Sequence, residues 1–126
     1  QAFALGETAA SGTIDAPIAR LDGSLIQRTV DFASGERSVT HYRTLAHCSG
    51  FSHLELSLET GRTHQIRVHM AYIGHPLLGD TLYNKTPGTF PRQALHSASL
   101  SFIHPITGEP LNFHAPLPED MQNLLT

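Results

Sequence analysis

One short segment of the 126-residue chain concentrates side chains that could do chemistry. It reads Thr-Gly-Arg-Thr-His-Gln-Ile-Arg-Val-His-Met over residues 60–70. The pattern predicts a strand that ends before a tight turn at Gly61, followed by a helix over residues 63–73 with its first residue as N-cap. The start of a helix presents unpaired N–H groups and a positive dipole end, which attract anions. Arg62, before this start, and Arg67, one turn inside it, therefore indicate an anion-binding site.

Arg67 stands beside the helix face that we expect to be buried, because Ile66, Met70 and Ile73 follow one another at helical spacing. A guanidinium in such a place needs an anionic partner, from the protein or from a ligand. The residue types leave two interpretations open. Either Arg67 makes a structural ion pair among surface and capping histidines, or it serves a binding site.

Other combinations of reactive side chains fit known chemistry less well. Four candidate metal ligands show no compact zinc spacing, and strand alternation would scatter them over two faces: His41, His47, Cys48 and His53. His64 and His69 are five residues apart, which is off a shared helix face. We therefore predict no metal site, and the single cysteine has no disulfide partner within the chain.

The composition is typical of one globular domain or part of one, with 40% hydrophobic and 15% charged residues. The apolar runs are too short to span a bilayer and residues 1–10 do not resemble a secretory leader, so we expect a soluble protein of the cytoplasm or an organelle. A net charge of −3 gives no overall attraction to nucleic acid. However, seven of the eight basic residues are Arg, whose planar fork suits phosphate.

Strands dominate the elements that must position these residues. Alternating polarity predicts a half-buried strand over His53–Glu59, with its leucines on the buried face. We expect Gln27–Ala33 and Val39–Ala46 to pair as a hairpin across a loop that contains glycine. Gly74 is placed to end the helix in the left-handed conformation. Residues 77–92 read as a long irregular loop.

The end of the chain predicts a second hairpin and a short helix. Ala98, Leu100 and Phe102 alternate as a strand that pairs with Leu111–His114 across a turn, and Pro118 opens the helix. Together these elements predict an α+β fold with a mainly antiparallel, mixed sheet, one central helix and a short C-terminal helix.

The motif at residues 60–70 resembles that of the RluA-type RNA pseudouridine synthases. It is followed by Gly-His-Pro-Leu-Leu-Gly-Asp at residues 74–80 and by Tyr83, as in that family. Further segments resemble the family in the same order, at residues 12–18, 40–42, 93–96, 104–109 and 115–118. The resemblance therefore covers nearly the whole chain, and it implies a pseudouridine synthase fold.

This resemblance implies isomerisation of uridine to pseudouridine in structured ribosomal or transfer RNA, without a metal or organic cofactor. In the family an aspartate attacks or deprotonates the ribose of a flipped-out uridine, and the uracil then rotates and reattaches through carbon. The resemblance makes Arg67 the catalytic arginine that pairs with this aspartate and keeps it ionised. Ile66 would pack near the uracil. The residues expected to contact phosphate or RNA are Arg62, His64 and Gln65.

The family's aspartate motif, Arg-Leu-Asp followed by Thr-Ser-Gly, does not occur before Gly12, where the register would place it. The one Arg-Leu-Asp, at residues 20–22, lacks that ending, and we interpret Asp22 as a surface turn residue. No counterpart of the family's active-site tyrosine stands near Gln1. We therefore expect residues 1–126 to be the C-terminal portion of a single pseudouridine synthase catalytic domain, inactive alone, with the nucleophile outside them.

Two alternatives remain open at this point. The chain could be a non-catalytic RNA-binding remnant, or a structural fragment that pairs with a missing half-domain through an open sheet edge. RNA is the expected partner of the enzyme, no membrane or metal partner is expected, and the full-length protein is expected to be a monomer.

Overall fold

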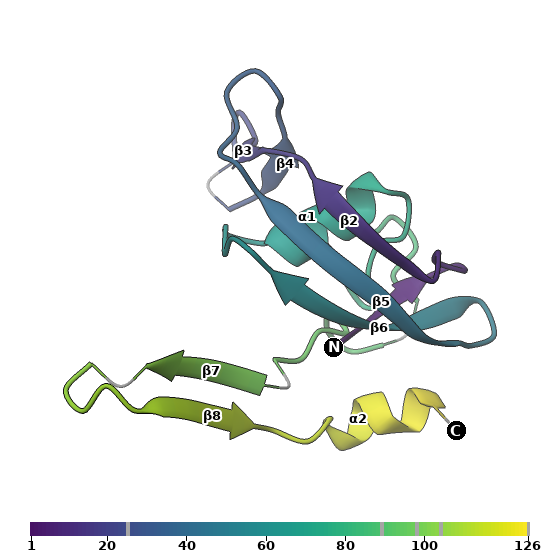
Figure 1. The fold of residues 1–126 in the computed structure, drawn as a ribbon. Coiled ribbons are helices and arrows are strands. Elements are labelled where there is room, and N and C mark those ends of the chain that lie inside the picture. Colours follow the sequence, from purple (N-terminus) through teal and green to yellow (C-terminus); the bar gives the residue numbers. More distant parts are fainter. Residues whose placement is uncertain (25, 89, 98, 104, 126) are drawn as a thin grey trace.

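A four-stranded antiparallel sheet forms the centre of the molecule (Figure 1). The structure, a computed structural model, describes residues 1–24, 26–88, 90–97, 99–103 and 105–125, and only the backbone of residues 99–103 and 111–114. In the order of pairing, the strands are β1 (Ala2–Leu5), β6 (Phe51–Leu58), β5 (Val39–His47) and β2 (Ser11–Asp15). All three pairings are antiparallel.

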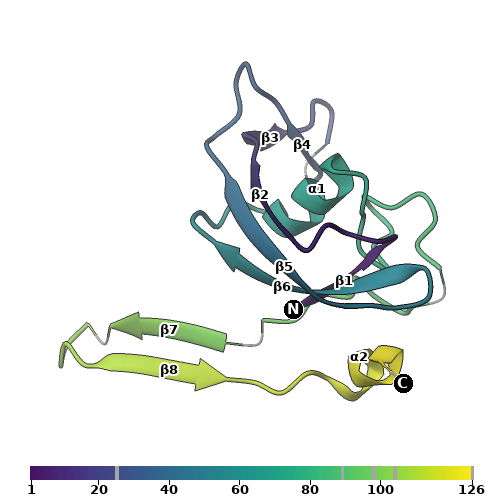
Figure 2. The ribbon, with the colours of Figure 1, turned by 45° about the vertical axis from the view of Figure 1, so that its right-hand side comes forward.

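Helix α1 (Gln65–Tyr72) covers one face of this sheet. A separate two-stranded ladder of β3 (Ile18–Arg20) and β4 (Arg28–Val30) lies beside the helix, as Figure 2 also shows. The polypeptide between residues 77 and 92 contains turns but, within its described residues, no helix or strand. The long irregular loop predicted there is confirmed for those residues.

The C-terminal part forms a hairpin of β7 (Ser99–Ile103) and β8 (Pro110–His114), followed by α2 (Glu119–Gln122) and a 3₁₀ turn, η1 (Asn123–Leu125). In both ribbon views the hairpin extends away from the main body. Its pairing confirms the predicted second hairpin, although Ala98 lies outside the described residues. The α+β class with mostly antiparallel strands is also confirmed.

The core has two parts because β1 is covered on both faces. Alternate residues of a strand point to opposite faces of the sheet. Ala2 and Ala4 accordingly face the cluster that contains Leu54 and Met70, between the sheet and α1. Phe3 faces the other way and forms a second cluster with Ala94 and with Met121 of α2. Burial of Met121 thus attaches the end of the chain to the first strand.

The predicted hairpin of Gln27–Ala33 with Val39–Ala46 is wrong. Strand β4 pairs with β3, whereas β5 pairs with β2 and β6. The chain turns away after β4 because the Asp31 carboxylate accepts the amides of Ala33 and Ser34, at 2.9 and 3.1 Å. Gly35 completes the turn, where a Cβ would lie only 2.4 Å from the Asp31 carbonyl oxygen.

The alternation over His53–Glu59 is confirmed only in part. Leu54 is fully buried as expected, but Leu58, near the end of the strand, is 46% exposed. His53, expected on the exposed face, is buried because its ring stacks on that of Phe3, with the two ring centroids 4.5 Å apart. The alternation pattern cannot reveal that the face bearing Phe3 is covered by the distant α2.

Helix α1 ends as predicted, with Gly74 in the left-handed region at φ 87°. The Gly74 amide donates to the Ala71 carbonyl at 3.0 Å and the His75 amide to the Met70 carbonyl at 2.8 Å, which is a Schellman termination. Of the three apolar residues predicted to be buried, Met70 is fully buried, and Ile66 and Ile73 pack partly buried against the core. A histidine of α1 is also buried, although the apolar pattern does not predict it.

That histidine is His69, whose two ring nitrogens both bind inside the core. Nε2 donates to the Ala16 carbonyl at 2.8 Å, because a carbonyl can only accept, and Nδ1 therefore accepts from the Thr40 hydroxyl at 2.7 Å. Burial lowers the pKa of His69, with the bond to Ala16 opposing part of the shift. The fold therefore holds a neutral imidazole between α1 and the sheet.

We predict that His69 makes the fold less stable as the pH falls from about 7.5 to about 5.5. The unfolded chain protonates His69 near its ordinary pKa whereas the folded chain resists protonation, so acid favours unfolding. Urea denaturation of the wild type and His69→Gln at the two pH values measures the effect. The free energy of unfolding should depend less on pH in the variant, and an equal dependence in both proteins would contradict this account.

Candidate functional site

A cleft of about 430 Å³ opens where α1 begins, and it is lined by all five residues that the sequence analysis selected. These are Arg62, His64, Gln65, Ile66 and Arg67. Leu58 at the end of β6 and Gln93 and Leu95 from the segment after the long loop complete its walls. Two parts of the chain that are distant in sequence, residues 58–67 and 93–95, therefore meet at this cleft.

The first turn of α1 has an unusual conformation. The helix begins at Gln65, so the predicted N-cap, Thr63, is wrong, and His64 takes that position with φ 57°. Residues other than glycine rarely adopt this left-handed region, at a cost of order 1 kcal/mol. The His64 ring is held by a hydrogen bond of 2.8 Å between its Nδ1 and the hydroxyl of Tyr83. The conformation brings His64 into the wall of the cleft.

Gln65 maintains this turn from inside the protein, where it is only 3% exposed. Its side-chain oxygen accepts from the Thr60 hydroxyl at 2.7 Å and from the Arg62 amide at 3.0 Å. Its side-chain nitrogen donates to the Val39 carbonyl at 2.9 Å and the Thr40 hydroxyl at 3.0 Å. The structure thus commits the Gln65 amide to the start of α1 and to β5.

Arg67 forms a bidentate ion pair with Asp80. Its Nε donates to Oδ2 at 3.0 Å and its Nη2 donates to Oδ1 at 2.9 Å. Asp80 is fully buried, and its Oδ1 also accepts from the amides of Leu82 and Tyr83. The centroid of the Tyr83 ring lies 5.2 Å from the guanidinium carbon of Arg67. The structural ion pair that the sequence left open is therefore present, with a partner from within the chain.

The electrostatics keep this pair charged. Burial by itself would raise the pKa of Asp80, but the hydrogen bonds from Arg67 and from the amides of Leu82 and Tyr83 outweigh it and lower the pKa. The hydrogen bond to Asp80 raises the pKa of Arg67, although burial opposes it. Asp80 is thus an ionised, enclosed anchor, and its oxygens are not exposed for attack on a substrate.

One nitrogen of Arg67 remains for another partner. Within the described residues, Nη1 makes no hydrogen bond, and no buried side-chain nitrogen or oxygen lacks a partner there, so Nη1 is open to solvent. His64, beside it, has a lowered pKa because of burial and the cations of Arg67 and Arg28. The cleft therefore offers a fixed cation next to a neutral imidazole.

The remaining selected residues have mixed surroundings. Arg62 pairs with Glu36 at 2.9 Å and donates from Nε to the Arg37 carbonyl at 3.0 Å. Ile66 is half-buried and packs on the core. Asp22 is exposed in a turn, as interpreted from the sequence. Sequence reasoning gave no role to Asp80, although it lies in the motif at residues 74–80, because nothing local shows that it meets Arg67.

We predict that Asp80→Asn lowers the free energy of unfolding by about 3 kcal/mol, because it leaves the Arg67 guanidinium without its charged partner. Asp120→Asn is the matched control, since Asp120 pairs with Arg92 at 3.1 Å on the surface. The control should lose less than about 1 kcal/mol. Urea denaturation at neutral pH measures both losses, and equal losses would refute the anchoring role of Asp80.

Comparison with known proteins places this arrangement in a family. The family model for RNA pseudouridylate synthase matches residues 1–72. The chain is similar to the human protein RNA Pseudouridylate Synthase Domain Containing 1, with a TM-score of 0.79 and 28% identity, over 91% of this chain and 52% of that one. The chain belongs to the RNA pseudouridylate synthase family, which confirms the resemblance seen in the sequence.

Two curated relatives are similar to the chain over part of their own length. The chain is 56% identical over 114 residues to the uncharacterized RNA pseudouridine synthase YjbO of Bacillus subtilis, covering 90% of this chain and 40% of that protein. It is 43% identical over 139 residues to the ribosomal large subunit pseudouridine synthase D of Escherichia coli K12, covering 99% and 42%. The chain thus spans about 40% of the length of these relatives.

The described part of the chain contains neither a cluster of metal ligands nor a membrane-spanning helix. Among the described residues, no group of three or more His, Cys, Asp or Glu side chains could hold a metal ion. No helix among the same residues has the length and apolar character needed to cross a membrane.

Proposed function

We propose that this chain is part of an enzyme that isomerises uridine to pseudouridine in structured RNA. The observation that carries the proposal is the cleft at the start of α1, which Arg67, His64 and Ile66 all line. Membership of the family supports the reaction class. Relatives named ribosomal large subunit pseudouridine synthase D favour ribosomal RNA over transfer RNA as the substrate.

Arg67 is the catalytic arginine of this proposal. Asp80 holds Nε and Nη2, so the guanidinium is fixed while Nη1 remains for a second carboxylate. That carboxylate is the nucleophilic aspartate, which we place outside residues 1–126. A fixed cation at hydrogen-bond distance would keep the aspartate ionised and oriented, as attack on the ribose or its deprotonation requires.

The reaction needs no oxidant or cofactor, because it only rearranges bonds. The bond between N1 of uracil and C1′ of ribose breaks, the uracil turns, a bond from C5 to C1′ forms, and the proton from C5 is replaced by one at N1. The base must leave the RNA stack to allow this rotation. Ile66 and Leu95 offer apolar surface for the uracil, and His64 and Arg62 line the same cleft and would contact the RNA.

Gln65 receives a positioning role in this scheme. Its amide is buried and holds the turn that presents His64 and Arg62. We further propose that residues 1–126 form the C-terminal portion of one catalytic domain. The lengths of the curated relatives, of which this chain covers about 40%, support that division.

We predict that Arg67→Lys in the full-length protein reduces pseudouridine formation by on the order of 100-fold or more, because lysine cannot hold two carboxylates with one planar fork. Lysine is preferable to alanine here, since Arg67→Ala would leave Asp80 buried without its cation. Arg43→Lys is the matched control, because Arg43 pairs with Glu55 at the surface. Turnover is measured on large-subunit ribosomal RNA made by in vitro transcription.

The control should keep wild-type turnover, and both variants should keep RNA affinity and a folded circular dichroism spectrum. Near-normal turnover by Arg67→Lys would refute the catalytic role of Arg67. A wild-type protein that binds this RNA and transfer RNA but modifies neither would favour the non-catalytic RNA-binding alternative.

We also predict that purified residues 1–126 form no pseudouridine, whereas the full-length protein does. The reason is that the described carboxylate beside Arg67, Asp80, is enclosed and fully hydrogen-bonded. The same assay on the two purified proteins measures this difference. Turnover by residues 1–126 would mean that the nucleophile lies within them.

A further inference from the structure

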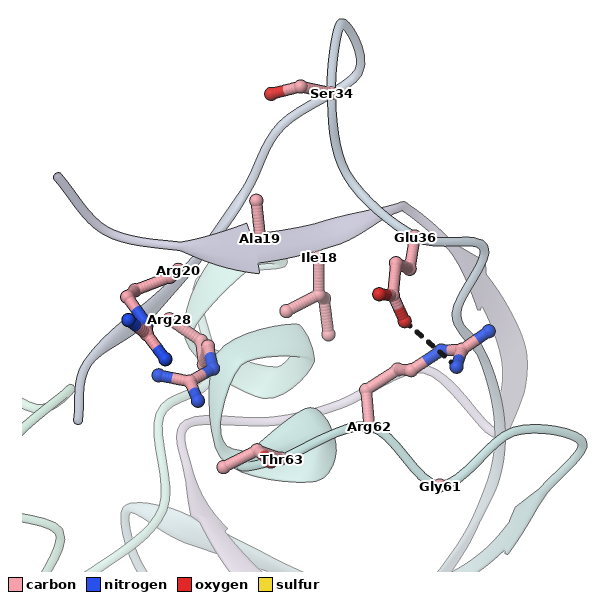
Figure 3. A pocket seen from close by; sticks show the side chains of 9 residues that line it. All are labelled: Ile18, Ala19, Arg20, Arg28, Ser34, Glu36, Gly61, Arg62 and Thr63. Carbon is pink, nitrogen blue, oxygen red and sulfur yellow. Dashed lines mark ion pairs between the residues drawn. The ribbon is translucent and has the colours of Figure 1, made fainter. Parts of the chain in front are cut away.

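A second cleft, of about 490 Å³, lies between the β3–β4 ladder and the loop that precedes α1 (Figure 3). Three arginines line it, Arg20, Arg28 and Arg62, together with the small polar residue Thr63. The proposed reaction uses only one of these arginines. Gly61 and Arg62 line both this cleft and the cleft that contains Arg67, so the two clefts are neighbours.

Arg20 and Arg28 occupy directly opposite positions in the β3–β4 ladder. Figure 3 shows their guanidinium groups side by side, extending from the ladder into the cleft. Two like charges in opposite positions of an antiparallel pair repel each other and destabilise the pairing. A pair of this kind is stabilised when an anion lies between the two cations.

Within the described residues, no carboxylate supplies that anion. Arg28 donates from Nη1 to the Ile26 carbonyl at 3.0 Å, and the Arg20 side chain makes no hydrogen bond or ion pair there. The acid that also lines this cleft, Glu36, is already paired with Arg62 at 2.9 Å. The local charge of the Arg20–Arg28 pair is therefore uncompensated, in a chain whose net charge is −3.

We propose that Arg20 and Arg28 bind a backbone phosphate of the substrate RNA, close to the uridine that enters the Arg67 cleft. Two planar forks match the tetrahedral arrangement of phosphate oxygens, and the hydroxyl of Thr63 on the facing wall adds a donor. Because Arg62 lines both clefts, one RNA strand could contact both of them. This inference rests on the proposed function and adds a subsite that holds the RNA.

The test is the RNA affinity of the full-length Arg20→Gln/Arg28→Gln protein as a function of salt, measured on the large-subunit ribosomal RNA transcript. A plot of log affinity against log salt has a negative slope, and loss of one phosphate contact should make this slope less steep by about 1. The affinity at low salt should fall on the order of 10-fold. In the assay of pseudouridine formation, the KM for this RNA should rise.

Two control proteins make the result specific. Arg43→Gln/Arg92→Gln removes the same charge from arginines already paired with Glu55 and Asp120, and it should leave the slope unchanged. Arg20→Lys/Arg28→Lys keeps the charge and should keep the slope. A wild-type slope in the Arg20→Gln/Arg28→Gln protein, or an equal decrease in the Arg43→Gln/Arg92→Gln control, would overturn the proposal.

A final arm separates RNA phosphate from a free anion. Inorganic phosphate at constant ionic strength is tested for its effect on the melting temperature of the wild type and the Arg20→Gln/Arg28→Gln protein. A rise confined to the wild type, together with unchanged RNA binding in the variant, would assign the subsite to a small anion and overturn the RNA assignment. The subsite can fail in these ways while Arg67→Lys still loses turnover, so the two proposals are tested separately.

Discussion

The buried carboxylate of Asp80 is the constraint on which the rest of the site depends. An ionised group without solvent must receive hydrogen bonds from every side, and Asp80 receives them from Arg67 and from two backbone amides. One anion therefore determines both the direction of the Arg67 side chain and the path of the loop after α1. Because that loop carries Tyr83, the same anchor positions the hydroxyl that holds His64.

A chain of buried polar groups attaches α1 to the sheet in a complementary way. Gln65 donates to Thr40, Thr40 donates to His69, and His69 donates to the carbonyl of Ala16. These bonds join the start and middle of the helix to β5 and to the segment after β2. The helix is thus held by directional contacts as well as by its apolar side chains.

Local patterns predicted those features that depend on neighbours in sequence. The helix, its Gly74 termination and the C-terminal hairpin all follow from short-range spacing and turn chemistry. The pairing of β4 was mispredicted, because the turn at Asp31 diverts the chain toward β3. His53 was misplaced for a similar reason, since the cover over its face comes from the far end of the chain.

The sequence by itself determined the family and the α+β class. The five residues that line one cleft are close together because they are near neighbours within the motif at residues 60–70. Only the tertiary structure decided which partners the side chains of this region have. It buried Gln65, paired Arg67 with Asp80 and set Arg20 opposite Arg28. Those outcomes depend on contacts between residues far apart in sequence or on different strands, and such contacts are fixed only when the strands and loops pack together.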